Sequence, residues 1–185
     1  MRRTKRCVLV VDPQNDFCAD GALIVPEADE IMPLINKILL EFKNETKVVS
    51  QDWHPEDHCS FKSRGGQWPV HCVAGTKGAE LHPELDSKLF TVIIRKATAK
   101  EKDAYSAFDG TGLEGLLKSL GIEEVFVCGL ATDFCVQATA LDSVKSFETI
   151  VIQDACKAVT AEGAREALLK MKSAGIKVIM SKEVI

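Results

Sequence analysis

The residues best suited to catalysis are concentrated in and around one segment, residues 53–90. It contains both tryptophans and every histidine of the chain: His54, His58, His71 and His82. Asp52 and His54 end an apolar run, and residues i and i+2 of a strand project to the same side. A carboxylate and an imidazole that converge, joined by a second imidazole, are the ligand set of a catalytic metal site with open positions. His71 is the preferred third ligand, His58 and His82 are rivals, and solvated loop histidines are the alternative interpretation.

Cys135 is the candidate nucleophile. Residues 129–135 leave an apolar run and open a helix, so Cys135 is expected in the first helical turn, where free N–H groups and the helix dipole favour a thiolate. The same N–H groups can bind the oxyanion that forms when a thiol attacks a carbonyl. The alternative, a buried structural cysteine, suits Cys7 and Cys128, which are embedded in apolar runs. No role follows for the remaining cysteines, which are Cys18, Cys59, Cys72 and Cys156.

Asp12 and Lys96 each end a further apolar run. Because the carboxyl ends of parallel strands meet at one edge of a sheet, where ligands bind, we expect both charges to lie near Asp52 and Cys135. There Asp12 can take the thiol proton, and the ammonium of Lys96 is expected to lower the pKa of the thiol. Each charge alone is better explained as an ion-pairing group, but their number at one edge favours catalysis.

The elements that must position these residues alternate between apolar runs and runs with helical spacing. The predicted strands are residues 7–11, 47–50, 92–95, 125–128, 149–152 and 178–180, and the predicted helices are residues 29–42, 113–120, 134–145 and 161–174. Such alternation implies parallel pairing with helices on both faces. We therefore predict an α/β fold, a three-layer α/β/α arrangement with a six-stranded parallel sheet of Rossmann-like type, whose strand order stays open. Residues 53–90 have no clear strand or helix pattern, and a loop of that length in a compact domain usually serves function.

Composition narrows the class of protein further. Hydrophobic residues make up 46% and charged residues 27% of the 185 residues, which predicts one globular domain over residues 1–185. A net charge of −4 without a basic stripe disfavours nucleic-acid binding. No apolar run reaches the roughly 18 residues of a membrane span. The chain has seven cysteines and no CxxC pair. The apolar stretch at its N-terminus is too short for a signal peptide. Together these features predict reduced thiols in the cytoplasm.

Several motifs match one family in both order and spacing. They are DPQNDF at 12–17, QDWHP at 51–55, HCSF at 58–61, WPVHCVAGTKGA at 68–79, Lys96, and GLATDFCV at 129–136. Over essentially its full length the chain resembles the nicotinamidases of the isochorismatase-like cysteine hydrolase family. The resemblance implies a six-stranded parallel sheet and hydrolysis of nicotinamide to nicotinate and ammonia in NAD salvage, with pyrazinamide as a second substrate.

The resemblance also implies roles for individual residues. It assigns Asp12, Lys96 and Cys135 as the catalytic triad. It assigns Asp52, His54 and His71 to one divalent metal ion, with zinc preferred and iron or manganese as alternatives. In some relatives a histidine at the position of His58 joins the metal.

The substrate pocket follows from the same comparison. The resemblance places the substrate ring between Phe17 and Trp68, with its nitrogen directed at the metal and Tyr105 at the pocket border. The oxyanion hole falls on the N–H groups of Ala131 and Cys135, after a cis Leu130–Ala131 peptide bond.

Three other functions remain as alternatives. An amidohydrolase of the same superfamily with another carboxamide substrate is the nearest one, but the two metal-ligand motifs favour a pyridine ring. A non-catalytic binding module predicts the loss of a triad residue, and none is lost. A thiol redox protein needs a resolving cysteine near Cys135, and no CxxC is present.

A homo-oligomer is left open, because interface faces cannot be told from core faces in the sequence.

Overall fold

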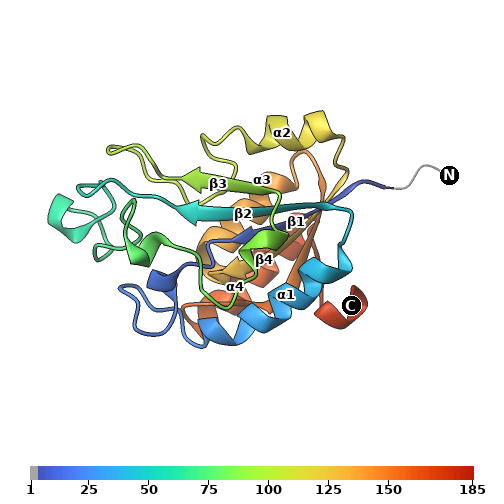
Figure 1. Ribbon diagram of the computed structural model, residues 1–185, viewed down its shortest axis with the longest axis horizontal. Helices are drawn as coiled ribbons and strands as arrows, with labels where there is room; N and C mark the ends of the chain where they lie inside the picture. The colour runs from blue at the N-terminus through green and yellow to red at the C-terminus, as the bar shows by residue number, and fades with distance from the viewer. Residues whose placement is uncertain (1–3) are drawn as a thin grey trace.

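Six strands form one all-parallel sheet in the order β3-β2-β1-β4-β5-β6 in the computed structural model, which describes residues 4–185 (Figure 1). The strands are β1 (Arg6–Val11), β2 (Thr46–Asp52), β3 (Val92–Lys96), β4 (Glu124–Leu130), β5 (Glu148–Lys157) and β6 (Lys177–Ile179). The predicted parallel sheet is thus confirmed. Two strand ends differ from the prediction: β5 continues beyond residue 152 to Lys157, and Met180 lies beyond the end of β6. The first three residues of the basic N-terminal stretch lie outside the described residues.

The α-helices of this described part are α1 (Met32–Glu41), α2 (Leu113–Leu120), α3 (Gln137–Ser143) and α4 (Ala161–Ser173). The prediction for residues 29–42 is wrong in its first turn, which is a 3-10 helix at Ala28–Ile31. Pro33 follows in the first turn of α1, where its missing N–H is not needed. None of the helices within residues 4–185 has the length and apolar character needed to cross a bilayer.

The predicted helix 134–145 is also wrong at its start. Residues Thr132–Val136 form a single π-helical turn, in which the N–H of Val136 donates to the carbonyl of Ala131 at 3.0 Å. A π-turn inserts one extra residue into the helical path and is frequent at functional sites. Cys135 therefore lies in this turn, and the regular helix α3 begins only after it.

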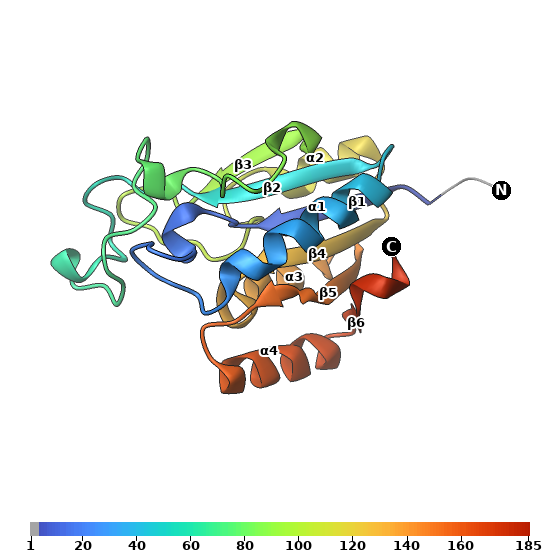
Figure 2. The ribbon, with the colours of Figure 1, turned by 60° about the horizontal axis from the view of Figure 1, so that its bottom comes forward.

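The helices cover both faces of the sheet, as predicted. The connection from β1 to β2 runs along the sheet in the opposite direction to those from β3 to β4, β4 to β5 and β5 to β6. Since parallel crossovers are right-handed, α1 must lie on one face and α2, α3 and α4 on the other. Figure 2 shows α1 in front of the strands, with α2 and α3 behind them.

The carboxyl edge of the sheet is where the candidate residues meet. Strand register pairs Asp52 with Lys96, and Val11 with Gly129. Gly129 has φ +115°, and a Cβ there would lie 2.2 Å from the carbonyl oxygen of Val11. Only glycine allows β4 to approach β1 this closely. The close approach brings the residue after β1, Asp12, beside the turn that follows β4.

The first part of residues 53–90 extends beyond the carboxyl ends of the strands, and the last part runs back along the sheet to the start of β3 (Figure 1). They contain three short 3-10 turns, Lys62–Arg64, Lys77–Ala79 and Ser87–Leu89, and no strand or α-helix, as predicted. Single β-bridges join His54 to Val73 and Phe61 to Trp68. The segment is therefore fastened by local pairings rather than by regular structure.

Candidate active site

Lys96 stands at the centre of the charged cluster that strand register creates. Its Nζ atom lies 3.0 Å from Asp12 Oδ2, 2.5 Å from Asp52 Oδ1 and 3.4 Å from Cys135 Sγ. It also donates to the carbonyl of Ala104 at 3.1 Å. Burial opposes the charged ammonium, yet the carboxylates of Asp12 and Asp52 outweigh burial and hold the pKa of Lys96 well above its ordinary value. The fold thus brings Asp12 and Cys135, the other two residues of the predicted triad, to the ammonium of Lys96.

The Oδ2 oxygen of Asp12 is the one available for proton transfer. Its Oδ1 accepts a hydrogen bond from Ser50 Oγ at 2.7 Å, whereas Oδ2 has no partner among the described residues other than the Lys96 ion pair. A carboxylate oxygen of Asp12 lies within 4.8 Å of Cys135 Sγ. Burial raises the pKa of Asp12, and Lys96 opposes that rise. A buried carboxylate of raised basicity beside a thiol has the properties of a general base.

The thiol itself differs from expectation. Burial raises the pKa of Cys135 well above its ordinary value; Lys96 lowers it, while the charges of Asp12 and Asp52 raise it further. The predicted lowering of the thiol pKa is therefore wrong as a net effect, because desolvation and two carboxylates outweigh one ammonium. A thiol of raised pKa needs a base for attack, and Asp12 is the adjacent carboxylate.

A set of metal-ligand atoms lies next to this cluster. Ligand atoms of Asp52, His54 and His71 are within 4.8 Å of one another, and all three residues are buried. Nδ1 of His54 donates to Ala97 O at 3.3 Å, and Nδ1 of His71 donates to Pro69 O at 2.8 Å. Both Nε2 atoms therefore carry lone pairs.

The donor atoms of the same three residues suit a metal ion. Nε2 of His54 is buried without a hydrogen-bond partner and lies 3.6 Å from Asp52 Oδ2. A buried lone pair facing a carboxylate oxygen is costly unless a cation joins them. Burial also lowers the pKa of His71, which favours the neutral form that binds metal. Carbonyl-bound Nδ1 groups are the usual outer support of metal-binding histidines.

The rival histidines have other partners. His58 Nε2 donates to Lys102 O at 3.2 Å and its Nδ1 lies 2.8 Å from Ser60 Oγ, so both nitrogens are occupied. Its ring lies against that of His54, with centroids 4.3 Å apart. In this structure His58 therefore packs against the ligand set through its ring, while its two nitrogens face Ser60 and Lys102.

His82 lies in a separate group with Cys18 and Asp29. Its Nδ1 accepts the N–H of Glu84 at 3.3 Å, so the proton is on Nε2, which donates to Asp29 Oδ1 at 3.1 Å. A protonated nitrogen cannot bind a metal. This histidine ties the segment of residues 53–90 to the 3-10 helix at Ala28–Ile31.

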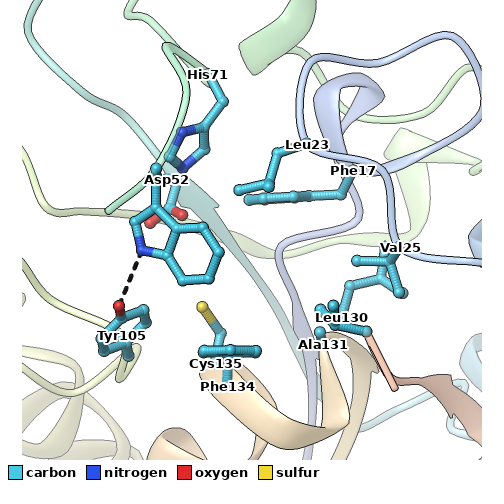
Figure 3. A pocket seen from close by; sticks show the side chains of 12 residues that line it. Phe17, Leu23, Val25, Asp52, His71, Tyr105, Leu130, Ala131, Phe134 and Cys135 are labelled. Atoms are coloured by element: carbon cyan, nitrogen blue, oxygen red, sulfur yellow. Dashed lines mark hydrogen bonds between the residues drawn. The ribbon is translucent and has the colours of Figure 1, made fainter. Parts of the chain in front are cut away.

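The pocket above Cys135 contains all four residues predicted to bind substrate. Its empty space, which includes the open mouth, is about 420 Å³. Its lining residues are Phe17, Leu23, Val25, Asp52, Trp68, His71, Tyr105, Leu130, Ala131, Phe134, Cys135 and Val159. Figure 3 shows the sulfur of Cys135 directed into the space between the aromatic side chains, with the carboxylate of Asp52 and the ring of His71 at one side. Trp68 Nε1 donates to the hydroxyl of Tyr105 at 3.0 Å, the dashed line in the figure.

Sequence reasoning missed several pocket residues. Leu23, Val25 and Val159 lie in loops, where a single apolar residue has no distinguishing pattern. Phe134 stands beside Cys135 in a motif and was recognisable from that position. Gln14 was missed as a support: its side chain donates to Asp52 O at 2.8 Å and accepts from Asp52 N at 2.8 Å.

The other observations concern the backbone and the remaining cysteines. The Leu130–Ala131 peptide bond is cis, as the resemblance implied. All seven cysteines are free; Cys59 is partly exposed and the others are buried. Cys18, Cys72 and Cys156 contribute no atom to the pocket.

Comparison with known proteins identifies the class. Residues 6–183 match the Isochorismatase domain family. The chain therefore belongs to the isochorismatase family of α/β proteins.

Individual relatives are similar over nearly the whole chain. The nicotinamidase of Acinetobacter baylyi is 42% identical, with 100% of this chain and 97% of the relative covered. The crystal structure of the pyrazinamidase of Pyrococcus horikoshii in complex with zinc is 46% identical, with a TM-score of 0.91 over 95% of this chain and 99% of that one. PnC1 from L. infantum in complex with nicotinate is 39% identical, with a TM-score of 0.95 over 98% and 96% of the two chains.

Proposed function

We propose that the protein is an amidohydrolase that converts nicotinamide to nicotinate and ammonia and also accepts pyrazinamide. One observation carries this proposal: the thiol of Cys135 and the ligand set of Asp52 and His71 open into the same aromatic pocket. A pyridine carboxamide has an amide carbon for the thiol and a ring nitrogen for a metal ion. The relatives named as nicotinamidase and pyrazinamidase, and the relative bound to nicotinate, support this substrate class.

The reaction then runs through a thioester. Asp12 takes the thiol proton as Cys135 Sγ bonds to the amide carbon, and the carbonyl electrons move onto oxygen. The C–N bond breaks as Asp12 returns its proton to nitrogen, which releases ammonia. Water then adds to the thioester carbon and gives a proton to Asp12. The C–S bond breaks and the sulfur recovers that proton from Asp12. The acid that leaves gives its hydroxyl proton to solvent and becomes nicotinate.

Lys96 stabilises the arrangement without exchanging a proton. Its ammonium holds Asp12 and contacts Cys135 Sγ, so it offsets the negative charge that moves between them. The N–H groups of Ala131 and Cys135 are proposed as donors to the oxyanion. Phe17, Trp68 and Tyr105 form the walls that hold the ring.

Asp52, His54 and His71 are proposed to hold one divalent metal ion, with zinc preferred. When bound, such an ion supplies a Lewis acid for the ring nitrogen of the substrate. The buried, unpartnered Nε2 of His54 supports this assignment within the chain itself. The zinc complex of the P. horikoshii relative supports the choice of metal.

We further propose that residues 1–185 act as one domain in the cytoplasm, with a small-molecule substrate and no nucleic-acid partner. The single sheet and the family match over residues 6–183 support the domain assignment. The net charge of −4 supports the absence of a nucleic-acid partner, and the seven unpaired cysteines support the cytoplasmic location.

Ammonia release tests the proposed function. Purified zinc-loaded protein should release ammonia from nicotinamide and pyrazinamide, and much more slowly from benzamide, which has the amide but no ring nitrogen. Cys135→Ala should abolish release, whereas Cys59→Ala, which alters a partly exposed cysteine outside the pocket, should retain it. Undiminished turnover by Cys135→Ala would overturn the covalent mechanism, and inactivity of the wild type on both pyridine substrates would overturn the substrate class.

A further inference from the structure

Phe61 contacts all three histidine rings of the metal region. Its ring centroid lies 5.5 Å from that of His54, 5.7 Å from that of His58 and 5.6 Å from that of His71. The interplanar angles of 82°, 68° and 65° make each contact edge-to-face. Phe61 is 0% exposed, so this position is enclosed on every side. One aromatic side chain therefore restricts the ring planes of the whole histidine cluster.

Hydrogen bonds alone leave those ring planes incompletely defined. His54 and His71 each have one bond from Nδ1 to a carbonyl, at 3.3 Å and 2.8 Å. A single bond permits rotation of the imidazole about the donor–acceptor direction. The edge-to-face contacts with Phe61 oppose that rotation, because tilting either ring would open a gap or cause a clash in a close-packed interior.

The backbone of Phe61 is also joined to the wall of the substrate pocket. Phe61 and Trp68 form a β-bridge, in which Lys62 N donates to Trp68 O at 2.7 Å and Trp68 N donates to Ser60 O at 3.0 Å. Gly66 closes this loop: a Cβ there would lie 2.1 Å from Ser60 O. Trp68 in turn packs edge-to-face on Phe134 at 5.1 Å. The loop of residues 60–68 is therefore a tight unit that has Phe61 at the histidines and Trp68 at the pocket.

We propose that Phe61 is a positioning residue that aligns His54 and His71 for metal binding and couples the metal site to the pocket wall at Trp68. The inference rests on the proposed metal site. It adds a residue that touches neither substrate nor metal, and it predicts that metal affinity and substrate binding depend on the same side chain.

The test is the zinc affinity of the protein comprising residues 1–185, measured by competition with a chromogenic chelator. Phe61→Leu keeps an apolar side chain but removes the flat ring, and its affinity for zinc should fall about tenfold, the lower end of the effect of residues that support metal ligands. The visible absorption of the cobalt-substituted protein should shift, because ligand orientation has changed. The KM for nicotinamide should rise while kcat at saturating zinc and substrate stays within about threefold of the wild type.

Phe42→Leu is the matched control. Phe42 is 2% exposed and packs edge-to-face on Phe126 at 4.9 Å, at the end of α1 and away from the histidines. It should lose similar stability and keep zinc affinity and the cobalt spectrum. If Phe61→Leu does not fold, Phe61→Met takes its place with the same expected results.

The outcomes separate this inference from the proposed function. A wild-type protein that binds zinc no better than His71→Ala would overturn the proposed metal site. A wild-type protein that binds zinc tightly, with Phe61→Leu equal to Phe42→Leu in affinity, cobalt spectrum and KM, would overturn the role of Phe61 alone.

Discussion

Lys96 Nζ lies 2.5 Å from Oδ1 of Asp52, the carboxylate whose Oδ2 faces His54 at 3.6 Å. One carboxylate therefore connects the ammonium of the catalytic cluster to the metal-ligand set. The contact also holds the pKa of Asp52 well below its ordinary value: burial alone would raise it, but the charge of Lys96 outweighs burial. Asp52 thus stays ionised in a buried position.

Lys96→Met tests how strongly this connection stabilises the fold. It leaves two buried carboxylates without their cation, and removal of one partner of a buried ion pair costs about 3–5 kcal/mol. We expect a loss of that order in the free energy of unfolding by urea, together with loss of turnover. Lys102→Met is the control: its pair with Asp109 is on the surface, and its loss should cost below about 1 kcal/mol. Equal losses for the two variants would contradict the central role of Lys96.

Removal of the metal should affect substrate binding more than the thiol. After chelation we expect the KM for nicotinamide to rise by more than about tenfold, because the ring loses its Lewis acid. Alkylation of Cys135 by iodoacetamide should continue at a rate within about threefold, since Asp12 and Lys96 remain in contact. Mass spectrometry of the alkylated protein measures the second quantity. Loss of alkylation together with binding would show that the metal ligands also hold the thiol.

Gly129→Ala should strongly destabilise the protein. The substitution places a Cβ 2.2 Å from Val11 O at φ +115°, so the two central strands must separate. We expect a loss of at least about 3 kcal/mol, measured by urea unfolding. Gly115→Ala, in the exposed part of α2 with open space around it, should instead stabilise by about 0.5–1 kcal/mol. A tolerated Gly129→Ala would mean that β1 and β4 are less closely packed than described.

The pair of Asp29 and His82 predicts a modest dependence of stability on pH. Burial would raise the pKa of Asp29, but hydrogen bonding from Ala19 N and the nearby His82 lower it below its ordinary value of 3.8. A lowered folded-state pKa stabilises the protein above the unfolded pKa, and this contribution is lost as the pH falls through the folded value. Since Asp29 is partly exposed, the contribution is below about 1 kcal/mol.

Asp29→Asn provides the measurement. The variant should be less stable than the wild type at pH 7 in urea unfolding, and the difference should shrink below pH 4 as the native carboxylate is protonated. An undiminished difference at pH 3 would show that the effect of the substitution comes from packing rather than charge.

The sequence by itself determined the elements and the candidate chemistry. Apolar runs and helical spacing depend on local order, so they located the six strands and four helices to within a few residues. Asp12, Lys96 and Cys135 were recognisable because parallel strands present their carboxyl ends at one edge. The resemblance added the family and its substrate class.

Only the tertiary structure showed the surroundings of each histidine and of the thiol. His58 and His82 were rivals of His71 until their partners, Ser60, Lys102, Asp29 and Glu84, became known. The raised pKa of Cys135 and the π-turn that carries it had no sequence signal. Proton positions and pKa values depend on burial and on groups brought together from distant parts of the chain, and neither can be read from local order.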